Sequence, residues 1–243
     1  MVDDPLIDDP LIDVVYMPLP TSLHVEWAVL AASKKKHVLL EKPTALDSTQ
    51  LQQILDACEA NNVQFMDGTM WYHHPRTDKI KHVISDSPNF GTIQLLPTYI
   101  TALPEVTLNS KGIILACIAS FHWEEEPKKN ATFYCSFLSH VSMDLVVHSS
   151  RGSVHVHDLA IPYRENSASF LLTTKGKGKE EVVVESRLPQ EALMVQEFAR
   201  LIDGIKSNER CSEKMWPEIS RKTQLALDAV RKSVEIVYKP VYL

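Results

Sequence analysis

Glycine is scarce in this sequence, with 7 among 243 residues, about 3%, whereas proteins on average contain ~7%. Cysteine is also scarce: Cys58, Cys117, Cys135 and Cys211 form no CxxC pair, which indicates reduced, mostly buried thiols. No run approaches the ~18 apolar residues of a membrane-spanning helix. Basic residues do not predominate, because 25 Lys and Arg oppose 31 Asp and Glu. We therefore expect a cytoplasmic globular protein that binds neither nucleic acid nor a membrane.

The segment from residue 14 to residue 69 alternates short apolar runs with helical patterns. Apolar runs at 14–17, 38–40 and 63–66 predict three buried strands. A helix is expected between each pair: the first capped by Thr21 or Ser22, the second opened by a capping box of Asp47 and Gln50. Strands and helices that alternate over short connections indicate a βαβαβ unit with a parallel sheet.

The pattern changes after residue 70, where we place a domain boundary. A helix is expected over 75–85, and two more close the chain, one with an apolar stripe from Met194 to Ile205 and one starting near Pro217. Between them lie β-rich runs joined by short turns, which predict an antiparallel meander. These runs are 92–96, 112–121, 131–138, 143–148, 153–157, 170–174 and 181–186. The predicted fold class is α/β followed by α+β.

Two short motifs follow the first two predicted strands. Pro18-Leu19-Pro20-Thr21-Ser22-Leu23-His24 lies where a strand ends and a helix begins, which is where open parallel sheets bind ligands. The alternative is an ordinary turn with a solvent-facing His24. Glu41-Lys42-Pro43 ends the next strand on the same edge. A lysine there either holds a ribose hydroxyl or stabilises a developing alkoxide, or it is simply a surface residue.

A third motif, Trp71-Tyr72-His73-His74-Pro75-Arg76, follows the third predicted strand. Its aromatic rings could stack on a ligand and Arg76 could bind an anion. The alternative is an aromatic segment packed at the start of a helix.

Two further patterns are weaker. His155 and His157 share one face of a strand, as metal ligands do, but the sequence shows no third and fourth ligand at a convincing spacing, and we expect no metal site. Gly176-Lys177-Gly178 is the one GxG sequence, yet no helix follows it, so it is not a dinucleotide fingerprint.

Taken in order, these motifs resemble the second half of the nucleotide-binding domain of the glucose-fructose oxidoreductase/inositol dehydrogenase/MocA family. VVYMPLPTSLHVEWA and HVLLEKPTAL are similar to its eukaryotic branch, related to dihydrodiol and xylose dehydrogenases. The β-rich remainder resembles the family's C-terminal domain, an open antiparallel sheet with flanking helices. The resemblance spans nearly all of residues 11–239. It implies a partial Rossmann domain over 1–70 and a substrate and oligomerisation domain over 71–243.

The resemblance also implies a chemistry. Family members use NADP or NAD to oxidise sugar-like or diol hydroxyl groups, or to reduce the corresponding carbonyls. It implies that Lys42 is the catalytic residue, close to the nicotinamide ribose and the reacting oxygen. Pro18, Leu19, Pro20 and His24, with Glu41 and Pro43, would contact the cofactor, and Trp71 and Arg76 would lie near it. A homodimer through the antiparallel sheet is a further expectation.

Two departures from the family pattern separate two hypotheses. The glycine-rich phosphate loop and its helix are missing, and the sequence after residues 92–96 runs directly into 97–104 without the insertion that carries the proton-handling residue. The chain thus resembles an N-terminally truncated and internally deleted member. Either it is an oxidoreductase whose activity is impaired, or it is a non-catalytic fragment that serves as an interaction module.

Overall fold

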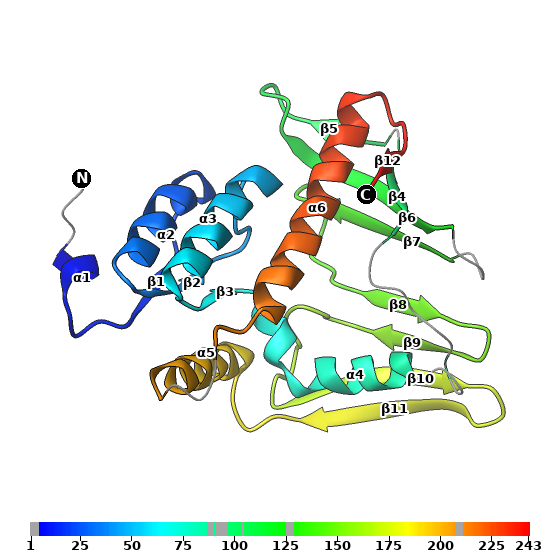
Figure 1. Cartoon of the computed structure of the whole chain (residues 1–243). Coiled ribbons are helices and arrows are strands. Elements are labelled where there is room, and N and C mark those ends of the chain that lie inside the picture. Colours follow the sequence, from blue (N-terminus) through cyan, green and yellow to red (C-terminus); the bar gives the residue numbers. More distant parts are fainter. Residues whose placement is uncertain (1–4, 87–89, 91–96, 104, 125–128, 208–210) are drawn as a thin grey trace. The chain divides into compact units, whose positions relative to one another are not determined.

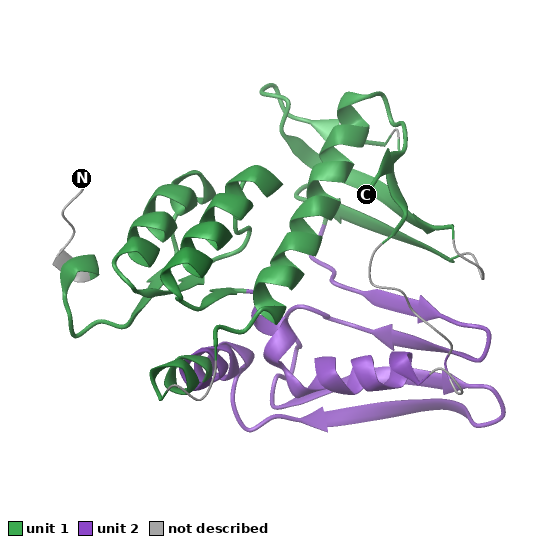
Figure 2. Ribbon diagram, in the orientation of Figure 1, with its two compact units in different colours: residues 1–68, 94–139, 201–243 green, residues 69–93, 140–200 purple. Residues whose placement is uncertain are grey.

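A computed structural model describes residues 5–86, 90, 97–103, 105–124, 129–207 and 211–243. Contacts within the chain group it into two compact units (Figure 2). Unit 1 comprises residues 1–68, 94–139 and 201–243, and unit 2 comprises residues 69–93 and 140–200. The domain boundary expected near residue 70 stays a prediction.

Unit 1 begins with the parallel sheet that the sequence predicts. Strands β1 (Val14–Met17), β2 (His37–Leu40) and β3 (Phe65–Asp67) lie in the order β1-β2-β3, and both pairs are parallel. Helices α2 (His24–Ser33) and α3 (Ser48–Asn61) pack side by side on the sheet (Figure 1). The βαβαβ prediction is therefore confirmed. Every residue of β2 and β3 is buried, which explains their continuous apolar runs.

The starts of the two helices differ from each other. The Asp47 side chain caps α3 and accepts a hydrogen bond from the Gln50 backbone N–H at 2.9 Å, as predicted. The predicted cap of α2 by Thr21 or Ser22 is wrong. Those residues belong to the 3-10 helix η1 (Thr21–Leu23), and α2 starts from Leu23 without a side-chain cap. The turn already continues the helical path, so Thr21 and Ser22 do not occupy the cap position.

His37 at the start of β2 gives unit 1 a pH dependence. Its buried ring accepts a hydrogen bond at Nδ1 from the Gln64 backbone N–H, 2.8 Å away, so this contact requires an unprotonated Nδ1. Burial lowers the pKa of His37, and the nearby Asp13 carboxylate partly offsets this shift. The neutral ring therefore contributes stability above its unfolded pKa of ~6.5, and that contribution is lost as the pH falls through the folded value.

We expect the free energy of unfolding to fall between pH 7.5 and pH 5.5, and to fall less in the variant His37→Asn. Asparagine keeps an acceptor near the Gln64 N–H but does not titrate. Urea denaturation at several pH values measures, for the parent chain and for His37→Asn, the slope of the free energy of unfolding against pH. Equal slopes in the two proteins would contradict the assignment to His37.

A second sheet of unit 1 is antiparallel. It contains β12 (Val241–Tyr242), β4 (Tyr99–Ala102), β6 (Ile114–Trp123) and β5 (Thr107–Leu108) in this order, and β7 (Lys129–Ser136) also pairs with β6. Helix α6 (Met215–Glu235) packs on it through Ala229 and Val230. Its Ser233 hydroxyl accepts from the Ala102 N–H and donates to the Lys239 carbonyl. Helix α6 also contacts β3 and α3, so it joins the two sheets of unit 1 (Figure 1).

Unit 2 is a four-stranded antiparallel sheet covered by a helix. Strands β8 (Leu145–His148), β9 (Gly152–Val156), β10 (Ser167–Thr174) and β11 (Gly178–Glu185) lie in the order β11-β10-β9-β8. Helix α4 (Pro75–Ser85) contributes Ile80 to a core with Val154, Val156 and Phe170. Helix α5 (Gln190–Lys206) begins in unit 2, and its residues from Leu201 on belong to unit 1. Its predicted stripe residues Met194, Phe198, Leu201 and Ile202 are buried.

The remaining expectations have mixed outcomes. The four cysteines are free, but only Cys58 and Cys117 are buried, so the expectation that most are buried is wrong. Residues 92–96, expected as a strand, lie outside the described part. The short helix α1 (Pro5–Asp8) and the 3-10 helix η2 (Met70–His73) were not predicted. No helix within the described ranges is long and apolar enough to cross a membrane.

Candidate functional site

The carboxyl edge of the parallel sheet brings together two of the predicted motifs. In the register of the sheet, Met17 lies beside Leu40, and Leu40 lies beside Asp67, so the three strands end at the same level. The chain leaves β1 through 18–20, β2 through 41–43 and β3 through Gly68. This edge is where an open parallel sheet presents ligand-binding loops.

His24 fixes the shape of this edge from inside. Its side chain is 1% exposed, so the interpretation of His24 as a solvent-facing residue is wrong. The ring Nε2 lies 2.8 Å from the Leu19 carbonyl oxygen, and Nδ1 lies 3.1 Å from the carbonyl oxygen of Thr44. Thr44 directly follows Glu41-Lys42-Pro43. His24 therefore joins the loop after β1 to the loop after β2, and we assign it a positioning role at the edge.

Replacing His24 with alanine is expected to destabilise unit 1 by about 1–3 kcal/mol, because the ring N–H no longer donates to a carbonyl oxygen of the neighbouring loops. Chemical denaturation measures the loss. Glu26→Ala, at an exposed position of the same helix, serves as the control and should change the free energy of unfolding by less than ~0.5 kcal/mol. Equal effects of the two substitutions would show that the His24 contacts contribute little.

Glu41 is held at the edge by three neighbours. Its carboxylate accepts a hydrogen bond from the Tyr16 hydroxyl at 2.7 Å and from the Lys42 backbone N–H at 3.1 Å. A Cβ added to Gly68 would lie 3.2 Å from the Glu41 carboxylate, so the carboxylate occupies the space that this glycine leaves open. The hydrogen bond to Glu41 raises the pKa of the Tyr16 phenol. Sequence reasoning missed Tyr16 and Gly68.

Lys42 is the exposed cation of this edge. The peptide bond between Lys42 and Pro43 is cis, and both residues are exposed. No hydrogen bond or ion pair joins the Lys42 ammonium to another residue in the described part of the chain. The backbone around it is held by Glu41 on one side and, through Thr44, by His24 on the other. A held backbone with an unengaged ammonium is suited to binding an oxygen of a ligand.

Arg76 lies in unit 2, and its donors are used there. The guanidinium, in a residue only 3% exposed, donates to the carbonyl oxygens of His157, Asp158, Leu159 and Ser169 at 2.9–3.3 Å. Burial lowers its pKa, while Asp158 acts in the opposite direction. These contacts do not favour the hypothesis that Arg76 binds an anion, and we leave it out of the proposed site.

The rest of the third motif builds the start of α4. The His74 side chain caps α4, accepting from the Arg76 N–H at 3.0 Å, and its Nε2 contacts the Glu165 carbonyl oxygen at 2.8 Å. Trp71 is half-buried beside Tyr72, with ring centroids 4.7 Å apart. A contribution of Trp71 to cofactor binding stays a prediction.

Gly176 lies in the tight turn between β10 and β11, and Gly178 is the first residue of β11. Both have positive φ angles, 90° and 81°, which glycine adopts without strain. The GxG sequence therefore serves a hairpin turn, in agreement with the expectation that it is not a dinucleotide fingerprint.

A comparison with known protein families matches the segment that contains the parallel sheet. Residues 3–69 match the NAD-binding Rossmann fold of the GFO/IDH/MocA oxidoreductase family. The chain is thus related to this family through residues 3–69.

Relatives in sequence match only part of the chain. An uncharacterised oxidoreductase of Rhizobium meliloti is 37% identical over 111 residues, 46% of this chain and 32% of the relative. A D-xylose 1-dehydrogenase (NADP(+)) of Haloferax volcanii is 34% identical over 80 residues, 33% of this chain and 25% of the relative. The matches therefore span a third or less of these relatives.

Solved structures match almost the whole chain. The 3-ketoreductase KijD10 of Actinomadura kijaniata, solved with TDP-benzene and NADP, has a TM-score of 0.76 at 18% identity, covering 94% of this chain and 79% of that one. An aldose-aldose oxidoreductase of Caulobacter crescentus, complexed with glycerol, has a TM-score of 0.79 at 15% identity, covering 98% and 81%. At such identities the likeness shows the fold, which confirms the predicted Rossmann-like parallel sheet followed by antiparallel sheets.

Proposed function

We propose that this chain carries the nicotinamide end of an NAD(P)-dependent oxidoreductase site that interconverts hydroxyl and carbonyl groups of sugar-like or diol compounds. The observation that carries the proposal is the unengaged ammonium of Lys42 at the carboxyl edge of a sheet whose residues match an NAD-binding family. A bound nicotinamide would supply or accept the hydride. Lys42, Pro43 and the 18–20 loop would face its ribose and ring.

Lys42 would act on the reacting oxygen of the substrate. When a carbonyl becomes an alcohol, negative charge develops on that oxygen, and a positioned ammonium stabilises it by a charge-assisted hydrogen bond. In the oxidative direction the same contact would stabilise the alkoxide formed as the hydroxyl proton passes to solvent water. Glu41 and His24 would position this lysine through the backbone, without touching the substrate.

We further propose that the 243-residue chain holds the dinucleotide weakly. The pyrophosphate of NAD(P) is best bound by amides of a glycine-rich loop at a helix N-terminus. The one GxG of the sequence lies in the β10–β11 hairpin instead. Each lost charge-assisted hydrogen bond removes ~1.5–3 kcal/mol, so the dissociation constant rises by orders of magnitude. Membership of the eukaryotic branch stays a prediction, as do the truncation and the internal deletion.

A second candidate function is that of a non-catalytic interaction module. Large apolar side chains are exposed on and after β7: Tyr134 at 60%, Phe137 at 85% and Leu138 at 64%. Such a surface favours association with a protein surface, including a second copy of this chain.

Calorimetry of the purified chain with NADPH and NADH, together with light scattering, separates the two functions. Weak NADPH binding that Lys42→Met weakens further supports the oxidoreductase site. A micromolar dissociation constant would contradict the proposed impairment but not the site. Undetectable binding at millimolar cofactor, combined with a concentration-dependent oligomer that Phe137→Ser dissociates, would favour the interaction module.

A further inference from the structure

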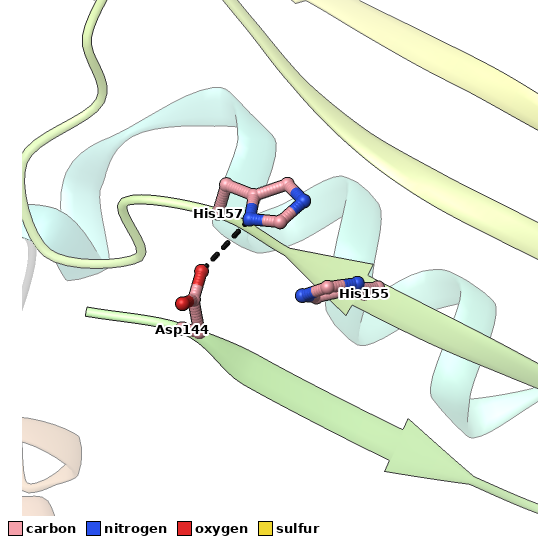
Figure 3. A group of neighbouring side chains, drawn as sticks. All are labelled: Asp144, His155 and His157. Carbon is pink, nitrogen blue, oxygen red and sulfur yellow. Dashed lines mark hydrogen bonds and ion pairs between the residues drawn. The ribbon is translucent and has the colours of Figure 1, made fainter. Parts of the chain in front are cut away.

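Three side chains with metal-binding donor atoms meet on the sheet of unit 2 (Figure 3). Asp144 directly precedes β8, His155 lies in β9, and His157 directly follows β9. One donor atom from each lies within 4.8 Å of the other two. The Asp144 carboxylate is 2.8 Å from His157 Nδ1, and the centroids of the two imidazole rings are 4.0 Å apart. We refer to these three residues as the His-Asp cluster.

Strand pairing explains why the cluster forms. His155 and His157 are two residues apart, so they project from the same face of β9. Because Leu145 pairs with Val156, the preceding residue Asp144 reaches His157 from the neighbouring strand. Val154 and Val156, on the opposite face, are completely buried. Alternation therefore directs all three donor side chains away from the core of unit 2.

The cluster is open to solvent. The His157 side chain is 60% exposed and that of Asp144 is 45% exposed. His157 also lines a hollow of about 460 Å³ in unit 2, together with Tyr163, Ser169 and Glu181. An ion from solution can therefore reach the cluster, and there is room beside it for further ligands.

We propose that Asp144, His155 and His157 bind a divalent transition-metal ion of the zinc type. Two imidazoles with one carboxylate favour zinc, nickel, cobalt or copper over magnesium and calcium, which prefer sites made of oxygen atoms. Ligands ~2.0–2.1 Å from a zinc ion at tetrahedral angles lie ~3.3 Å apart, which exposed side chains reach by small rotations. The hydrogen bond between His157 and Asp144 is replaced by one bond from each residue to the ion. Water or a small anion completes the coordination.

The sequence alone does not reveal this site. His155 and His157 are two potential ligands, and Asp144 is 11 residues from the nearer of them. Only the antiparallel pairing of β8 with β9 brings the carboxylate to the imidazoles. The expectation that the chain has no metal site rested on the missing third ligand, which the fold provides.

Calorimetric titration with zinc chloride, and with cobalt chloride followed by visible absorption, tests the proposal on the full chain. We expect one ion per chain at the cluster. Asp144→Asn and the double variant His155→Ala/His157→Ala should each raise the dissociation constant at least ~10-fold, since losing even an indirect partner of a metal ligand costs that much. His148→Ala is the matched control, because His148 is also exposed on β8 but is not part of the cluster. It should bind like the parent chain.

Cobalt absorption distinguishes this site from the thiols. Cys117 and Cys135 pair across β6 and β7 with their sulfur atoms 3.6 Å apart, and cobalt bound there would show intense thiolate charge-transfer bands. The proposal is supported by a visible cobalt spectrum that has no thiolate bands, that disappears in Asp144→Asn and that persists in His148→Ala. Thiolate bands with unchanged affinity in the cluster variants, or no binding at millimolar metal, would overturn it. Circular dichroism checks that the variants fold, which is expected because the replaced side chains lie on the surface.

Discussion

Replacing Arg76 with methionine is expected to lower the free energy of unfolding of unit 2 by about 3–5 kcal/mol. Methionine fills a similar apolar volume, but it donates no hydrogen bond. The carbonyl groups of residues 157, 158, 159 and 169 would lose their shared partner, at ~1–3 kcal/mol for each one left buried and unsatisfied. Water that enters the site would satisfy some of these carbonyl groups, so the total loss of stability is smaller than the sum of the four individual costs. Denaturant unfolding with circular dichroism measures it.

Two further variants make this result interpretable. Arg76→Lys keeps the charge but cannot reach four carbonyls with one ammonium, so it should recover only part of the loss. Arg187→Met replaces an arginine at an exposed position and should leave the unfolding transition nearly unchanged. If Arg76→Met were as stable as Arg187→Met, the buried contacts of Arg76 would not support unit 2. In that case the hypothesis that Arg76 binds an anion would be favoured again.

The second large effect is expected at Lys42. Lys42→Met should reduce turnover by ~10²–10³-fold, because it removes the donor that faces the developing charge on the substrate oxygen. Stability should not change, since the Lys42 side chain is exposed. The measurement is kcat in a relative that has both the Glu-Lys-Pro motif and a glycine-rich phosphate loop, together with NADPH affinity in the present chain.

The matched control is Lys175→Met, which replaces an exposed lysine of the β10–β11 hairpin. It should leave the affinity for NADPH unchanged. A kcat that survives substitution of the motif lysine would return Lys42 to the alternative interpretation, an ordinary surface residue after a strand.

Local patterns predicted the parallel sheet of unit 1 well. The apolar runs of β1 to β3 and the cap at Asp47 depend on neighbours a few residues away, so the sequence contains them directly. Strands β4, β5 and β12 were missed, and β5 and β12 have only two residues each, too few to show an alternation. Their pairing is set by β6 and β4, which lie elsewhere in the chain.

The chemistry of individual side chains was harder to predict than the fold. Histidine or arginine at a helix start can face solvent or a buried carbonyl, and sequence spacing does not distinguish these environments. His24 reaches Thr44, 20 residues away, and Arg76 reaches a carbonyl 93 residues away. Lys42 could be singled out because it comes just after a predicted strand, at the edge where parallel sheets bind ligands. The functional interpretation of that loop came from family resemblance, with no contribution from periodicity.

Because unit 1 is assembled from three stretches of the chain, its assembly during synthesis on the ribosome must be discontinuous. The Gln64 side chain forms hydrogen bonds with the backbone of Glu213, 149 residues later. The backbone N–H of Ser48, the first residue of α3, donates to the Asp228 carboxylate, 180 residues later. At ~5–20 residues per second, translation separates these partners by roughly 7–36 s. Throughout that interval the nascent parallel sheet lacks α6. Its apolar surface is then available to chaperones, and helix α6 completes the packing of β3 and α3 once it emerges.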